Sequence, residues 1–222
     1  MKLYFSPLSC SLATRIALYE AGAEATYVEV DPKTKKTSDG LDFRTIHALG
    51  LVPTLCMDDG ELLTENAAIL QHVAERFPLA ELAPRDPTGR ARLQQWLCFI
   101  GTELHKGLYV PLLDPRAPEA AKAYALTKAE SRLSWLASKL EGREHLLDRF
   151  SVADAYLLTV LNWSVVTPVD LKPWPAITSY HKRVSERPSV ARAVTEEKKL
   201  YAQELARHAA APVVLETLPR PA

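Results

Sequence analysis

The sequence predicts an α/β domain followed by an all-α domain. Residues 1–78 alternate short apolar runs with helical patterns in the order βαβ, a connection, then ββα. Residues 79–88 hold Pro84 and Pro87 and show no clear period, as expected of a linker. Residues 89–208 carry long amphipathic helical patterns, and residues 209–222 are expected to form a disordered tail.

Composition narrows the class of protein. The 222 residues include 27 Lys and Arg against 27 Asp and Glu, so the formal net charge is zero. This balance argues against nucleic acid or an anionic membrane as the main partner. Three scattered cysteines and the absence of a signal-peptide pattern favour a cytoplasmic protein without disulfides. No apolar run is long enough to span a membrane, and the dispersed histidines predict no metal site.

The first 30 residues are expected to form a strand, a helix and a second strand. Residues 3–5 are an apolar run typical of a buried strand, and helical spacing then follows from Cys10 to Gly22, a residue suited to a left-handed cap. Residues 26–30 alternate and are rich in β-branched and aromatic types. Such a unit implies two parallel strands joined by a right-handed crossover.

Cys10 is the first candidate for chemistry. It is expected at the start of a helix, where unpaired backbone N–H groups and the helix dipole favour negative charge. A thiol in that position tends toward a lowered pKa. The alternative interpretation is a small residue that packs the helix start.

The rest of the first domain is predicted from turn signals and periodicity. A polar loop is expected over residues 31–42 and a short helix over residues 43–49. A hairpin follows, with strands from residue 54 and over residues 61–63 around the turn Asp58-Asp59-Gly60. A helix then opens near Asn66.

Pro53 and the pair Glu65–Asn66 are further candidates. A cis Val52–Pro53 bond would leave the Val52 backbone free to pair with an extended ligand, whereas the base rate favours an ordinary trans proline. Asn66 can cap a helix whose N–H groups suit a carboxylate, and Glu65 can hold an ammonium. The pair therefore suits an amino-acid head group, or it is an ordinary helix start.

The second domain is predicted to be helical throughout. Residues 151–154 form a capping box of the [ST]-x-x-[DE] type, so Asp154 is expected to be structural. Pro111, Pro115 and Pro118 are expected to mark a break after the first long helix. The expected helices cover residues 90–108, 120–140, 151–166, 177–184 and 190–206.

His105 is a candidate on the first of these helices. It follows Cys98 by seven residues and Thr102 by three, so helical spacing predicts that the three share one stripe. A histidine there can act as an acid–base group or hydrogen-bond a thiol. The alternative is a packing or surface histidine.

Taken in order, these stretches resemble bacterial glutathione transferases of the beta class over about residues 1–205. The resemblance is carried by residues 1–4, 9–13, 51–55, 58–60, 63–69, 102–107 and 150–157. It implies the glutathione transferase fold, with a thioredoxin-like N-terminal domain and an all-α C-terminal domain. It also implies a homodimer that uses glutathione as co-substrate.

The resemblance implies a role for each candidate in the first domain. Cys10 would lie beside the glutathione sulfur and could form a mixed disulfide with it. Val52, before a cis Pro53, would pair with the cysteinyl backbone. Glu65 and Asn66 would hold the γ-glutamyl group, with Asn66 standing where the family more often has a serine.

Five further residues complete the implied site. Lys35 would meet the glycyl carboxylate, and His105 and Lys106 would reach the site from the second domain. Glu103 and Cys98 would contribute across the dimer interface, with Cys98 in place of the family's usual asparagine.

Two functions follow from this pattern. The first is a transferase that conjugates the glutathione thiolate to small hydrophobic electrophiles in an apolar cleft between the domains, with thiol–disulfide exchange through Cys10 as a second activity. The alternative is a non-catalytic ligand-binding or protein-interaction module of the same fold. Leu51 and Cys98, which replace polar residues of the family, favour the alternative slightly. The enzyme is favoured by the presence of Cys10, Pro53, Glu65 and His105.

Overall fold

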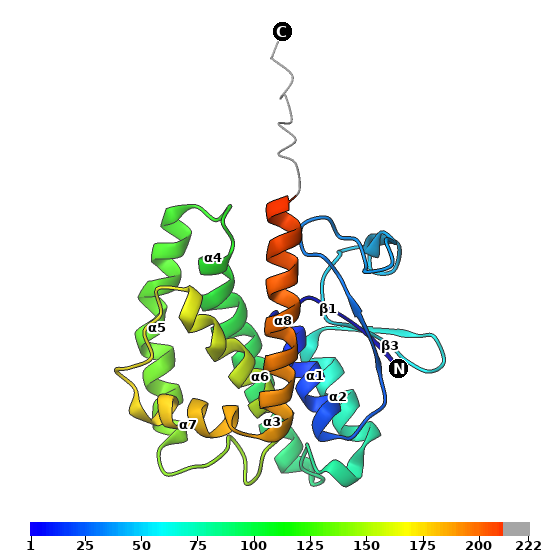
Figure 1. Ribbon diagram of the computed structural model, residues 1–222. Helices are drawn as coiled ribbons and strands as arrows, with labels where there is room; N and C mark the ends of the chain where they lie inside the picture. Colours follow the sequence, from blue (N-terminus) through cyan, green and yellow to red (C-terminus); the bar gives the residue numbers. More distant parts are fainter. Residues whose placement is uncertain (211–222) are drawn as a thin grey trace.

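A four-stranded sheet organises the N-terminal part of the chain in the computed structural model, which describes residues 1–210. The strand order is β2-β1-β3-β4. β1 (Lys2–Phe5) pairs in parallel with β2 (Thr26–Glu29) and antiparallel with β3 (Thr54–Cys56), which pairs antiparallel with β4 (Leu62–Thr64). The helices α1 (Ser11–Glu20) and α2 (Asn66–Arg76) pack against each other (Figure 1). The predicted order βαβ–ββα is confirmed.

Two short segments of this domain differ from their predictions. The helix expected over residues 43–49 is a single 3₁₀ turn, η1 (Phe43–Thr45), followed by irregular backbone up to β3. The polar loop over residues 31–42 is more ordered than expected, because isolated bridges join Val30 to Thr37 and Lys36 to Asp42. The linker region contains a second 3₁₀ turn, η2 (Pro78–Ala80).

The first long helix of the C-terminal part is built from three consecutive segments. α3 (Pro87–Phe99) continues into a π-helix, η3 (Ile100–Tyr109), and then into α4 (Val110–Leu113). The predicted break is present over residues 114–118, where Pro115 and Pro118 lie, whereas Pro111 lies within helical backbone that continues to Leu113. Pro111 is the second residue of α4, directly after the π-helix, so its missing N–H falls where the hydrogen-bond spacing of the helix changes.

The C-terminal part is centred on α6 (Val152–Leu161), whose ten residues are all buried and which packs against α1, α3, η3 and α7. This is expected of a helix that is apolar on every side. The other segments are α5 (Glu119–Leu140), η4 (Asn162–Val166), α7 (Pro175–Ser185) and α8 (Pro188–Ala210). Of the tail predicted over residues 209–222, residues 209 and 210 belong to α8, and the others lie outside the described residues.

The two parts of the chain meet mainly at α1. This helix packs against α6 and α8 of the C-terminal part, and Figure 1 shows α1 beside both. A single cluster of buried apolar side chains runs through both parts, from Leu3 of β1 to Ala193 of α8. The loop between β1 and α1, which carries Cys10, therefore lies where the two parts join.

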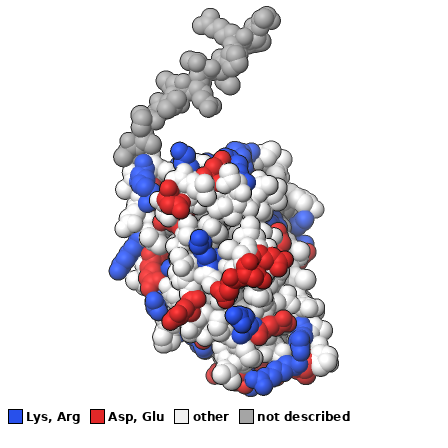
Figure 2. All heavy atoms as spheres, turned by 90° about the vertical axis from the view of Figure 1, so that its right-hand side faces the viewer, with Lys and Arg blue, Asp and Glu red and all other residues white. Residues whose placement is uncertain are grey.

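The surface agrees with the neutral composition. On the face shown in Figure 2, acidic and basic side chains are interspersed, with a short acidic band across its middle. Within residues 1–210, no helix combines the length and the apolar character needed to cross a membrane.

Candidate active site

Cys10 lies at the start of α1, as the sequence predicts, and takes the N-cap position itself. Its half-buried thiol donates a hydrogen bond to the Val52 carbonyl oxygen at 3.3 Å. The loop beneath it is held by serines: the Ser6 hydroxyl donates to Val30 O at 2.5 Å, and the Ser11 hydroxyl donates to Ser6 O at 3.2 Å. The β1–α1 and η1–β3 loops thus meet at the Cys10 sulfur.

The electrostatics of Cys10 contradict the expectation of a lowered pKa. Burial raises the pKa of the Cys10 thiol to about 11, although the Lys106 ammonium and nearby backbone N–H groups oppose the shift. Removing the sulfur from water disfavours the thiolate more than the helix N-terminus favours it. At neutral pH the unliganded protein therefore holds Cys10 as a neutral thiol that can donate a hydrogen bond.

The Val52–Pro53 bond is cis, as the family resemblance implies and against the base rate for such bonds. Among residues 1–210, the Val52 N–H has no hydrogen-bond partner, while its carbonyl accepts from Cys10. This leaves one backbone donor open to a ligand beside the thiol.

Asn66 is not the helix cap that the sequence suggests. Glu65 takes the N-cap position with φ of +65°, and Asn66 is the first residue of α2 and is buried. The Asn66 Oδ1 accepts from the Thr14 hydroxyl at 3.0 Å, whereas its Nδ2 has no partner within residues 1–210. Since buried amides are normally satisfied, the Nδ2 is a candidate donor to a bound ligand.

His105 reaches the same region through Tyr156, a residue that the sequence interpretation missed. The His105 Nδ1 lies 2.7 Å from the Tyr156 hydroxyl, and the His105 ring packs on Trp163 with centroids 4.9 Å apart. Tyr156 in turn lies near Cys10 and Asn66, and burial raises its pKa. A tyrosine in an apolar helix resembles an ordinary core residue, so no local signal singles out Tyr156.

Cys98 and His105 do not share a stripe, which corrects the prediction. Cys98 is exposed, whereas His105 is 7% exposed. The π-helix begins two residues after Cys98, and its wider turns rotate later side chains away from the positions that α-helical spacing gives them. Glu103, on the same π-helix, pairs with Arg132 of α5 at 2.8 Å. In the single chain, neither Cys98 nor Glu103 is brought to the Cys10 thiol.

Two lysines complete the predicted set. Lys106 is exposed, and its charge acts on both Cys10 and His105, lowering the pKa of each. Lys35 lies in the loop after β2 with φ of +58°, and its side chain runs beside Gly50. Partial burial lowers the pKa of Lys35, with Arg44 and Arg116 adding to the effect.

The state of His105 leads to a prediction about pH. Burial, and secondarily Lys106, lowers the pKa of His105 to about 4 from its ordinary 6.5. Between these pH values the unfolded chain binds more protons than the folded one, so stability falls as the pH is lowered. We expect His105 to contribute a loss of about 2 kcal/mol in the free energy of unfolding between pH 7 and pH 5.

Urea unfolding of wild type and of His105→Gln, each at pH 7 and at pH 5, measures this contribution of His105 to the free energy of unfolding. The pKa of His181 is also lowered by burial, so the wild-type slope contains more than one histidine and the comparison isolates His105. An undiminished pH slope in His105→Gln would contradict the prediction.

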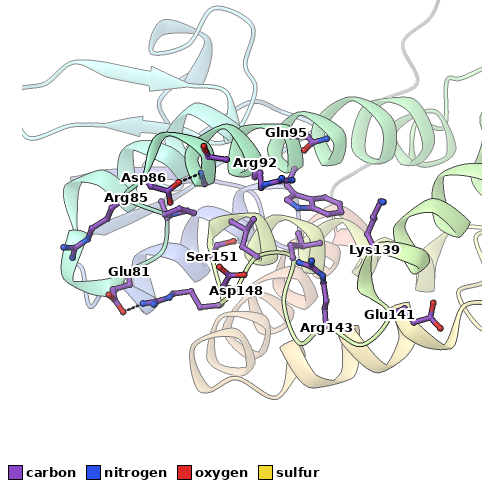
Figure 3. A pocket seen from close by; sticks show the side chains of 18 of the residues that line it. Glu81, Arg85, Asp86, Arg92, Gln95, Lys139, Glu141, Arg143, Asp148 and Ser151 are labelled. Atoms are coloured by element: carbon purple, nitrogen blue, oxygen red, sulfur yellow. Dashed lines mark hydrogen bonds and ion pairs between the residues drawn. The ribbon is translucent and has the colours of Figure 1, made fainter.

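A groove elsewhere on the molecule does not coincide with these residues. It has a volume of about 1290 Å³ and lies between the linker, α3, α5 and the loop before α6 (Figure 3). Arg92 and Arg143 border it, and Arg149 pairs with Glu81 at one end. None of the predicted site residues lines it. Across residues 1–210, no group of three or more His, Cys, Asp or Glu side chains is placed to hold a metal ion.

Comparison with known proteins identifies the family. The family model "Glutathione S-transferase, N-terminal domain" matches residues 1–75, and "Glutathione S-transferase, C-terminal domain" matches residues 96–188. The chain is 40% identical to glutathione S-transferase GstA of Escherichia coli O157:H7 over 200 residues, which cover 89% of this chain and 98% of GstA. The chain belongs to the glutathione S-transferase family.

Solved structures of bacterial glutathione S-transferases share the whole fold. A beta-class enzyme from Sphingomonas chungbukensis is 44% identical with a TM-score of 0.84, covering 89% of this chain and 98% of that one. A sphingomonad glutathione S-transferase complexed with glutathione is 42% identical with a TM-score of 0.85, covering 89% and 99%. The predicted beta-class resemblance, the thioredoxin-like and helical fold, the enzyme class and its co-substrate glutathione are confirmed.

Proposed function

We propose that this glutathione S-transferase conjugates glutathione to small hydrophobic electrophiles. The observation that carries the proposal is the arrangement around Cys10. A neutral thiol contacts the Val52 carbonyl, and Tyr156 lies near both this thiol and the unpaired amide of Asn66. Together they offer a sulfur partner and open hydrogen-bond donors to one peptide-like ligand.

In this proposal glutathione lies along the N-terminal domain. The free Val52 N–H pairs with the backbone of the cysteinyl residue, and Glu65 and Asn66 hold the charged head of the γ-glutamyl group. Lys35 meets the glycyl carboxylate. The support is that Val52 and Asn66 each keep a donor without a partner in residues 1–210 and that Lys35 runs beside Gly50, two residues before Val52.

Cys10 acts in this proposal as a hydrogen-bond donor to the glutathione sulfur. A thiol whose pKa is about 11 keeps its proton at neutral pH, so the incoming glutathione is the sulfur that ionises and attacks. The thiolate forms a bond to the electrophilic carbon, and the leaving group departs with its electron pair. Lys106 favours the negative charge near Cys10, and neutral His105 orients Tyr156.

Thiol–disulfide exchange is the second activity that we propose for Cys10. When oxidised glutathione binds, Cys10 must lose its proton before it attacks one sulfur of the disulfide and releases the other as a thiolate. The raised pKa makes this route slow at neutral pH. Conjugation is therefore the main reaction in this proposal.

The dimer is also proposed, from the family resemblance. Cys98 is exposed and Glu103 pairs with Arg132 of α5, so neither contacts the Cys10 of its own chain. In a dimer, we expect Glu103 and Cys98 of one protomer to lie beside the glutathione that is bound to its partner. The cytoplasmic location expected from the cysteine pattern stays a prediction.

Two measurements test the proposed transferase function. The first is retention of the protein on immobilised glutathione, and the second is an assay of glutathione conjugation to an aryl halide. Retention with turnover supports the transferase. Retention without turnover favours the non-catalytic module of the same fold, and the absence of both contradicts the glutathione site as well.

Two reagents are expected to select different cysteines. Near neutral pH, iodoacetamide should alkylate the exposed Cys98 faster than Cys10, because the thiolate is the reactive form and burial raises the pKa of Cys10. Oxidised glutathione should instead modify Cys10, because binding places its disulfide there. Peptide mass spectrometry measures both, and glutathionylation at Cys98 instead of Cys10 would contradict the proposed site.

A further inference from the structure

Leu8, two residues before Cys10, is held by side chains from the other part of the chain. Its backbone is in the left-handed region with φ of +58°, which an apolar side chain rarely adopts. The Leu8 N–H donates to Glu197 Oε2 of α8 at 2.7 Å. The Leu8 carbonyl accepts from Trp163 Nε1 of η4 at 3.0 Å. Both backbone groups of this one loop residue are thus bound by the helical part.

Glu197 is a buried acid that the proposed chemistry does not use. Its side chain is 0% exposed, and its Oε1 lies 2.9 Å from Arg15 Nε. Arg15 is 4% exposed and lies between the rings of Phe5 and Tyr27, at 4.2 Å and 4.3 Å from their centroids. The ion pair therefore joins α1 to α8 in the interior, while the second carboxylate oxygen is directed at Leu8.

Such a pair is poorly explained by stability alone. Burying two charges costs several kcal/mol, and apolar residues of similar volume often stabilise a protein as well or better. The position of the Glu197 carboxylate relative to Leu8 explains the buried pair better than stability does. One oxygen of Glu197 lies against the Arg15 guanidinium, and the other accepts the Leu8 N–H of the loop that carries the thiol.

We propose that Glu197 is a positioning residue for the reaction. Through the Leu8 N–H it fixes the β1–α1 loop in the conformation that presents the Cys10 thiol to the Val52 carbonyl and to the substrate sulfur. Trp163 donates to the carbonyl of the same residue, Leu8, and packs on His105, so the helical part sets the position of both the Cys10 loop and His105. This inference rests on the proposed function for its catalytic readout only.

The test compares two double variants that share one background. Arg15→Met removes the buried cation from both, so that neither leaves an unpaired charge. Glu197→Gln then keeps an acceptor for the Leu8 N–H, whereas Glu197→Leu has a similar volume and no acceptor. The difference between the two reports the contact to Leu8 and not the ion pair.

The Leu variant is expected to have a kcat for conjugation about tenfold below that of the Gln variant, the order expected when a buried donor is left unpaired. The KM of the Leu variant for glutathione should stay within about twofold of that of the Gln variant. The residues proposed to bind glutathione, Val52, Glu65 and Asn66, lie on other segments. Iodoacetamide should alkylate Cys10 several times faster in the Leu variant, since a released loop exposes the thiol to water. Cys98 is the internal reference for this rate.

Equal kcat and equal Cys10-to-Cys98 alkylation ratios in the two variants would overturn the proposal. A wild type without conjugation would refute the proposed function, and the alkylation ratio would still test the role of Glu197. If the Leu variant does not fold, Trp163→Phe removes the side chain that donates to the Leu8 carbonyl and should raise the Cys10 alkylation rate in the same way. An unchanged ratio in that variant would count against the proposal.

Discussion

Replacing Asp154 with alanine is expected to cost about 3–5 kcal/mol of unfolding free energy, a large share of the stability of a domain of this size. Asp154 is 0% exposed at the start of α6. Its Oδ2 accepts from the Ser151 N–H and the Ser151 hydroxyl, both at 2.9 Å, and its Oδ1 accepts from Leu146 N at 2.9 Å and the Tyr180 hydroxyl at 2.8 Å. Alanine leaves these buried donors without an acceptor.

Asp86 provides the matched control. Its carboxylate also lies at the N-terminus of a helix, where it accepts the Gly89 N–H of α3 at 2.8 Å. Unlike Asp154, Asp86 is exposed to solvent. Asp86→Ala should therefore cost about 1 kcal/mol, because water replaces the lost acceptor. Urea unfolding of both variants measures the difference. Equal losses would mean that Asp154 acts only as a helix cap.

Replacing Cys10 with alanine should lower kcat/KM for conjugation by about tenfold to a hundredfold. The thiol keeps its proton, so its proposed role is to donate a hydrogen bond to the glutathione thiolate, and such charge-assisted bonds contribute about 1.5–3 kcal/mol. Cys10→Ser retains a donor and should keep most of the conjugation rate. Both variants should lose disulfide exchange, because neither has the sulfur.

Conjugation and disulfide-exchange assays on the two variants, with circular dichroism to verify the fold, separate the roles of Cys10. If serine were as damaging as alanine for conjugation, the sulfur itself would be the attacking group. If alanine left conjugation intact, Cys10 would not contact the substrate sulfur in the reaction.

The sequence predicted correctly those features that depend on interactions between residues close together in the chain. The hairpin turn at Asp58-Asp59-Gly60, the capping box at Ser151–Asp154 and the left-handed Gly22 depend on residues a few positions apart, and all three are present. The π-helix over Ile100–Tyr109 was missed, because its residues have no composition that distinguishes it from an α-helix. Packing of this segment against α5 and α6 accompanies the wider turns.

The candidate site was predicted in part. Cys10, Val52 and Pro53 meet as expected, since the start of β3 lies beside the end of β1 in the antiparallel pair and Cys10 follows β1 at the start of α1. Tyr156 and Glu197 were not predicted. They lie 146 and 187 residues beyond Cys10 by their numbers in the sequence, on helices where nothing in the local pattern distinguishes them from core residues.

The sequence by itself determined the order of strands and helices, the place of Cys10 at a helix start and the family to which the chain belongs. These depend on periodicity, turn residues and short motifs, which act between neighbours in the chain. Only the tertiary structure decided the protonation state of Cys10, the partner of His105 and the anchoring of Leu8 by Glu197. Each of these depends on burial and on contacts between segments far apart in the chain, and desolvation there outweighs the local effect of the helix N-terminus.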